Sequence, residues 1–218
     1  MVQLFIGYGQ LIRNRRYFPL WLAQLFSNLG DTLHYIALVV WVYQRTGSSL
    51  AVAGTVFFEV VPIVLLAPVA GVVIDRFSRK AVLVVSDVLR AVLVLALLLT
   101  TEQWQVYTIV ALTTAAGTFF NPAVSATLPT LLSADDLLAA NSVSWSTGRF
   151  VQIIGSAVAL GVIGVIGAEA AFVFNAFTFL VSALLLLLLP VPPGRKVDAR
   201  GWRGYVEDAG EGPALCPP

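Results

Sequence analysis

Six ionisable side chains interrupt the apolar runs of this sequence, and they are the residues best placed to do chemistry. They are Asp31, His34, Glu59, Asp87, Arg90 and Arg149. In a membrane-spanning helix a charged side chain costs about 2.5–3.5 kcal/mol on insertion scales, so such residues face the protein interior or a wet cavity. Carboxylates and an imidazole in that setting can take up protons or hold a charged substrate.

Asp31 and His34 lie three residues apart, which places them on one face of a helix. At 1.5 Å per residue, His34 and Glu59 each lie about 14 Å from the outer end of their apolar run, close to the middle of a bilayer. These two side chains could therefore meet if their helices are neighbours. Two interpretations stay open: a site for protons or substrate, and a fixed polar contact that locks two helices together.

Asp87 and Arg90 are also three residues apart, and their simplest interpretation is a structural ion pair. Arg149 is different because no acidic residue lies within a helical turn of it in the sequence. It needs either an anionic partner elsewhere in the bundle or an anionic group of a substrate.

The composition indicates the setting of these residues. The chain has 218 residues, of which 58% are hydrophobic and 11% are charged, whereas a soluble domain has roughly 25% charged residues. A bilayer core needs about 20 apolar residues per helix, and six runs qualify: 17–43, 50–74, 81–100, 106–126, 141–166 and 170–189. The predicted fold is an all-α integral membrane bundle of six helices over residues 17–190. An N-terminal arm (1–16) precedes the bundle, and a basic tail (191–218) follows it.

Lys and Arg residues concentrate on one side of these six runs. That side carries Arg13, Arg15, Arg16, Arg76, Arg79, Lys80, Arg195, Lys196, Arg200 and Arg203. The links on the other side hold only Arg45 among the basic residues. Because cytoplasmic loops are enriched in Lys and Arg, both termini are predicted to be cytoplasmic in a multi-pass protein of the cell membrane.

Several kinds of chemistry are not expected. The single cysteine, Cys216, excludes an internal disulfide, and one histidine rules out paired-histidine metal chemistry, so neither a metal nor a cofactor is predicted. The net charge is +1 and the basic residues form no continuous face, which gives no indication of nucleic-acid binding. A membrane enzyme acting on lipid head groups is disfavoured because there is no paired-acid metal motif and no His-rich cluster. The expected partners are the lipid bilayer and a small-molecule substrate.

Small and aromatic residues predict how the helices pack and where they end. The fifth run carries Gly148, Gly155, Gly161 and Gly164, a pattern typical of close helix packing in membranes or of a hinge. Aromatic residues are expected at the two membrane interfaces. These residues are Trp41, Tyr43 and Trp104 at the outer side, and Tyr17 and Trp21 at the inner side.

The link between the second and third runs has the pattern G-x-x-x-D-R-x-x-R-K, formed by Gly71, Asp75, Arg76, Arg79 and Lys80. It resembles the signature loop of the major facilitator superfamily, with Ser78 where that signature usually has Gly. Further stretches are similar to the macrolide and enterobactin exporter branch: Asn28-Leu-Gly-Asp31, Ser86-Asp87-Val-Leu-Arg90, Asn121-Pro122, Ala140-Asn141-Ser142 and Ala171-Phe172-x-x-Asn175.

The resemblance implies the N-terminal half of a transporter fold, built from two inverted three-helix repeats, with substrate bound between two such halves. It also implies that Asp75 and the basic hinge residues help to close the cytoplasmic side by docking against helix ends, and that Asp31 lies near the central cavity. The implied activity is efflux of amphipathic small molecules by alternating access, driven by an ion gradient and involving no enzymatic step.

Four alternatives remain open because the superfamily has two six-helix halves and this sequence supplies one. The chain could be a non-transporting truncated fragment, caused by a premature stop or frameshift. It could work as a homodimer or with a separate second half. It could also import rather than export.

Overall fold

The computed structural model describes residue 11 and residues 14–190, and the basic tail predicted over 191–218 lies outside the described residues. Within that part of the chain, six helical segments are long and apolar enough to cross a membrane. They are α2 (Phe18–Thr46), α3 (Ser49–Arg76), α4 (Arg79–Ala96) with the short 3-10 turn η1 (Leu97–Leu99), α5 (Gln103–Thr118) followed by α6 (Phe120–Leu131), α7 (Ala134–Ile166) and α8 (Ala168–Leu187). The predicted all-helical six-span architecture is confirmed.

The fourth span is divided into α5 and α6 at Phe119. Asn121 and Pro122 lie in the first turn of α6. Proline is well accommodated there, because the first helical residues have no intrahelical acceptor for their N–H groups. Helix α7 begins at Ala134, after Ser133 at the N-cap position and before the apolar run that starts at Asn141. Asp135 and Asp136 occupy its first turn, where negative charge is favourable beside the helix N-terminus.

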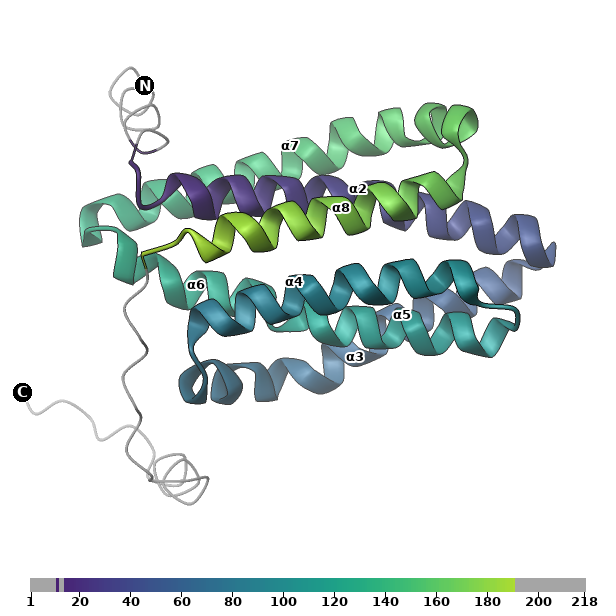
Figure 1. Ribbon diagram of the computed structural model, residues 1–218, viewed down its shortest axis with the longest axis horizontal. Helices are drawn as coiled ribbons and strands as arrows, with labels where there is room; N and C mark the ends of the chain where they lie inside the picture. The colour runs from purple at the N-terminus through teal and green to yellow at the C-terminus, as the bar shows by residue number, and fades with distance from the viewer. Residues whose placement is uncertain (1–10, 12–13, 191–218) are drawn as a thin grey trace, which may run out of the picture.

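Two apolar clusters occupy opposite ends of the bundle. One unites residues from the start of α2, the α3–α4 link, the end of α6 and the end of α8, such as Leu20, Leu83, Leu131 and Leu186. The other unites the far end of α2 with η1, α5, α7 and the start of α8. In Figure 1 the first cluster lies toward the left end of the helices and the second toward the right end. Polar residues are buried between them, among them Asp87, Arg90 and Asn175.

Helix α8 contacts both α2 and α4 along its length and lies between them. Gly30 permits the closest approach of α2 to α8, because a Cβ added there would lie 2.0 Å from Thr178 Oγ1 and 2.3 Å from Asn175 Oδ1. The sequence pattern drew attention to the glycines of α7 instead. Of these, Gly148 and Gly155 pack against α2, whereas a Cβ at Gly161 or Gly164 would meet nothing within 4 Å.

The expected aromatic belts are partly wrong. Tyr43 and Trp104 are exposed, as belt residues should be, but Trp41 is buried edge-on against Phe172 with the Arg45 guanidinium over its ring. Tyr17 is fully buried, and its hydroxyl lies 2.9 Å from Ser144 Oγ and 3.2 Å from the Ala140 carbonyl oxygen. Both residues lie near the ends of α2, where neighbouring helices cover them.

Candidate functional site

A cavity of about 940 Å³ opens in the middle of the bundle between the two apolar clusters. Its wall is formed by α2, α3, α4, α5, α6 and α7, and the charged residues on it are Asp31, Glu59, Arg90 and Arg149. Many of its other lining side chains are polar but uncharged, including Gln24, Asn28, Thr114 and Asn121. A polar hollow at this depth is typical of a transport pathway rather than of a packed core.

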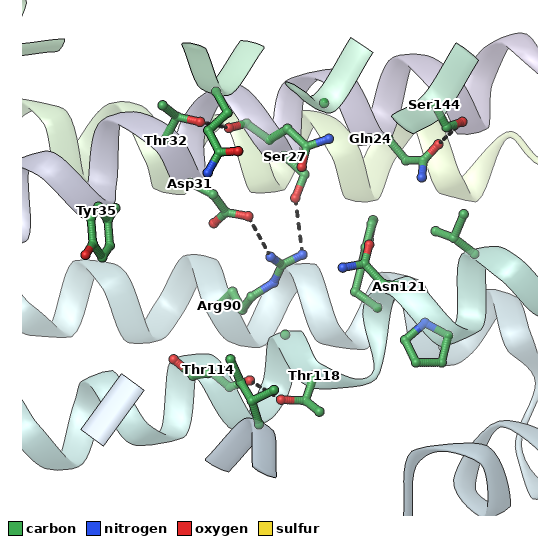
Figure 2. Close-up of a pocket in the computed structure, with 18 of the residues that line it drawn as sticks. Gln24, Ser27, Asp31, Thr32, Tyr35, Arg90, Thr114, Thr118, Asn121 and Ser144 are labelled. Carbon is green, nitrogen blue, oxygen red and sulfur yellow. Dashed lines mark hydrogen bonds and ion pairs between the residues drawn. The ribbon is translucent and has the colours of Figure 1, made fainter. Parts of the chain in front are cut away.

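Arg90 on α4 is the centre of the charge cluster, and Figure 2 shows its guanidinium directed at α2. Its Nη1 lies 3.3 Å from Asp31 Oδ2, and its Nη2 donates to Ser27 Oγ at 3.3 Å. Nη2 also forms the ion pair with Asp87 one turn earlier on the same helix. The Arg90 guanidinium carbon lies 4.2 Å from the ring centroid of Phe179, which adds a cation–π contact.

The two carboxylates bound by Arg90 differ in exposure. The Asp87 side chain is 0% exposed, whereas the Asp31 side chain is 46% exposed and faces the cavity. Asp87 is therefore a fixed internal counter-charge, and Asp31 is the carboxylate that a substrate or a proton can reach. The spacing of the residues in the sequence indicated the Asp87–Arg90 contact but not the Asp31–Arg90 contact. A signal was present, since Asp31 and Arg90 lie about 20 Å and 17 Å along their helices from the same end of the bundle.

Helix α8 contributes polar side chains to this cluster, and of these the sequence motifs described above include Asn175 alone. Asn175, Thr178 and Ser182 are buried on the face of α8 that packs against α2 and α4. Asn175 Nδ2, Ser182 Oγ and Asp87 Oδ2 have no hydrogen-bond partner within the described residues. Their spacing of three and four residues along a helix was the available signal.

His34 is placed differently from the expectation that it would meet Glu59. It is 8% exposed, its ring centroid lies 5.3 Å from that of Phe172 on α8, and its Nδ1 has no partner within the described residues. Between residues 14 and 190, no hydrogen bond or ion pair joins His34 to Glu59. The physical reason is that α8, rather than α3, packs closely along α2.

Glu59 and Arg149 are charged wall residues without a partner of opposite charge in the part of the chain that the structure describes. Glu59 is half-buried on α3. Arg149 is exposed on α7, where its Nη1 donates to Gln152 Oε1 at 2.7 Å and its guanidinium carbon lies 5.0 Å from the Trp145 ring. Within the described residues, the acid that Arg149 requires is therefore not supplied by the other helices.

The signature loop meets the bundle mainly through one residue. Lys80 Nζ donates to the carbonyl oxygens of Leu187 at 2.6 Å and Leu189 at 3.0 Å, which satisfies free carbonyls at the end of α8. Asp75 and Arg76 are exposed, no hydrogen bond or ion pair of theirs appears within residues 14–190, and a Cβ at Gly71 would meet nothing within 4 Å. Lys80 thus makes the contact with a helix end that the resemblance assigned to Asp75 and the basic residues together.

Comparison with known proteins identifies the family. The family model described as Major Facilitator Superfamily matches residues 20–215. The chain belongs to this superfamily of membrane transporters. It is 31% identical to the uncharacterized MFS-type transporter YfiS of Bacillus subtilis over 182 residues, which cover 83% of this chain and 44% of YfiS.

Two further relatives carry more specific names. Macrolide efflux protein A of Streptococcus pyogenes is 20% identical, over 81% of this chain and 45% of that protein. BacE of Bacillus subtilis, whose name proposes that it exports bacilysin, is 29% identical over 81% of this chain and 44% of its own length. The chain thus spans a little under half the length of the relatives that it matches.

Proposed function

We propose that this chain forms the N-terminal six-helix half of an exporter of amphipathic small molecules in the bacterial cell membrane. The observation that carries the proposal is the polar cavity of about 940 Å³ at mid-bundle, with a reachable carboxylate, Asp31, on its wall. The names of Macrolide efflux protein A and BacE support export as the direction and amphipathic compounds as the cargo. A second six-helix half would close the cavity from the open side.

In the proposed cycle, Asp31 couples substrate binding to an ion gradient. When Asp31 accepts a proton or a cationic group, its attraction to Arg90 weakens, while Arg90 remains held by the buried Asp87. The positive charge of Arg90 on α4 is therefore neutralised by Asp87 both before and after Asp31 accepts the proton or cation. Helix α2 is then free to move relative to α4 at little electrostatic cost. Alternating access then follows from one half moving against the other.

The signature loop is proposed to act at the cytoplasmic side. Lys80 connects the start of α4 to the end of α8. The exposed Asp75 and Arg76 and the partly exposed Arg79 are proposed to contact the second half when the inner side closes. Both termini are proposed to be cytoplasmic, because the links on that side carry most of the Lys and Arg residues.

The proposal is tested by drug accumulation in a bacterial host that lacks its own major efflux pumps. The chain is expressed alone and together with the C-terminal half of YfiS, and intracellular ethidium and a radiolabelled macrolide are measured. We expect lower accumulation with both halves present, and loss of that effect in Asp31→Asn but not in the exposed control Glu102→Gln.

The alternatives have separate outcomes in the same assay. Export by the chain alone, abolished by Asp31→Asn, would indicate a homodimeric half-transporter. Higher accumulation than in the empty host would indicate import. Unchanged accumulation in both settings, with the chain present in the membrane, would contradict transport and leave a non-transporting fragment.

A further inference from the structure

The charges on the cavity wall are separated by sign. We propose that the cavity binds a zwitterionic amphipath, a small molecule with an ammonium group and a carboxylate at separate positions. Asp31 and Glu59 would face the ammonium group, and Arg149 would face the carboxylate. This inference rests on the proposed export function and specifies the charge class of its substrate.

The side of the cavity formed by α2, α3 and α4 has an excess of negative charge. This region holds three carboxylates, those of Asp87, Asp31 and Glu59, and one guanidinium, that of Arg90, which pairs with Asp87 and Asp31. Asp31 is reachable and Glu59 has no cation beside it in the described residues. Because an unpaired carboxylate such as that of Glu59 is costly at mid-membrane depth, a cationic group of a ligand would be stabilised beside it.

The side formed by α7 carries the opposite charge. Helix α7 runs alongside α2 in the same direction, since Gly148 packs against Asn28 and Gly155 packs against Thr32. This register places Arg149 at about the depth of Asp31. Its side chain is exposed and lines the cavity, and among the residues that the structure describes it contacts a neutral amide and an indole ring. It can therefore form a bidentate contact with a carboxylate.

The two charges of the wall that have no partner of opposite charge within the described residues, Glu59 and Arg149, lie on different helices, α3 and α7. Helices α3 and α7 lie at opposite edges of the bundle in Figure 1, and no ion pair joins Glu59 to Arg149 within residues 14–190. A purely cationic ligand would leave Arg149 unpaired, and a purely anionic ligand would face two carboxylates. A ligand with both charges satisfies both sides at once.

Two further groups fit such a ligand. His34 lines the cavity and is more than nine-tenths buried, and its Nδ1 has no hydrogen-bond partner within the described residues. The exposed rings of Tyr35 and Trp145 also line the cavity and offer aromatic faces to its apolar body. The expected ligand therefore has the character of a short apolar peptide with free ends.

The test uses three probes that share one apolar body: leucyl-phenylalanine, its C-terminal amide and its N-acetyl derivative. The first is a zwitterion, the second only a cation and the third only an anion. Binding to the purified full chain in lipid nanodiscs is measured by calorimetry. We expect leucyl-phenylalanine to bind at least about tenfold more tightly than either relative, the effect of one charge-assisted contact.

The variants assign each charge to its side chain. Glu59→Gln is expected to remove the preference for the zwitterion over the N-acetyl form, and Arg149→Gln to remove the preference over the amide. Glu59→Asp and Arg149→Lys should retain most of each preference, and Glu169→Gln and Arg16→Gln at exposed positions should change neither ratio. If Glu59→Gln or Arg149→Gln fails to fold, the test rests on Glu59→Asp, on Arg149→Lys and on the binding ratios of the unmodified chain.

Three results would overturn the inference: equal binding of the three probes, ratios that both neutral variants leave unchanged, or no binding of any probe. Its failure is distinguishable from failure of the export proposal. If the charge class alone is wrong, cellular accumulation still responds to Asp31→Asn. If the export proposal is wrong, accumulation is unchanged as well.

Discussion

Arg90 Nη1 on α4 lies 3.3 Å from Asp31 Oδ2 on α2, and the same guanidinium also binds the fully buried Asp87. One cation thus connects two helices and compensates a carboxylate that water cannot reach. Because removal of one partner leaves a buried charge uncompensated, the three residues have unequal importance for stability. Arg90 is therefore expected to matter more for stability than Asp31.

Arg90→Met should be strongly destabilising, by about 3–5 kcal/mol, because it leaves Asp87 unpaired in the interior. Asp31→Asn should cost much less, because Arg90 keeps Asp87 as its partner. Replacing both buried partners, in Asp87→Leu with Arg90→Met, should recover most of the loss. Thermal unfolding in detergent measures all three, and a double variant no more stable than Arg90→Met would contradict this explanation.

Gly30→Ala should destabilise the bundle by about 1–3 kcal/mol, the usual effect of overpacking a tight contact. The added Cβ would lie 2.0 Å from Thr178 Oγ1 and 2.3 Å from Asn175 Oδ1, so these side chains or the two helices must shift. Gly161→Ala on α7 is the matched control, because its Cβ would meet nothing within 4 Å. Equal melting temperatures for the two variants would show that α2 and α8 do not approach closely at Gly30.

Lys80→Met should loosen the last turn of α8, because Lys80 Nζ donates to the carbonyls of Leu187 and Leu189. The loss should be within about 1 kcal/mol and local, as expected for a cation at a helix C-terminus. Hydrogen exchange with mass spectrometry should show faster exchange in the peptide that ends α8, with Lys80→Arg intermediate. Arg76→Met at an exposed neighbouring position should leave this peptide unchanged.

Cysteine labelling tests the predicted orientation. In a Cys216→Ser background, Ser78→Cys in the α3–α4 link should react with a membrane-impermeant maleimide only after cells are opened. Thr101→Cys, at the opposite end of the bundle, should react in intact cells. The reverse pattern would invert the bundle and move the signature loop to the outside.

The sequence predicts the fold well because a bilayer allows few structures for a long apolar segment. Twenty apolar residues in a row have few alternatives to a spanning helix, so the six segments follow from hydropathy alone. The break between α5 and α6 at Phe119 does not follow from hydropathy, because the apolar run continues through it.

The candidate site is less accessible to sequence reasoning. Spacing along one helix places Asp87 beside Arg90, but the contact of Arg90 with Asp31 depends on how α4 and α2 are rotated. His34 illustrates the same limit. Its depth in the membrane matches that of Glu59, but its side chain packs against Phe172 on α8. Depth follows from counting residues, whereas rotation is determined by packing between helices distant in the sequence.

The contact at Gly30 has a mechanical consequence. It lies near the middle of α2, next to the charged cluster. Apolar side chains fill the space between the helices toward each end of the bundle. The missing side chain at Gly30 brings the Asn175 and Thr178 side chains of α8 directly against the backbone of α2. In the proposed movement of one half against the other, α2 and α8 would then travel together, joined at Gly30 and Thr178.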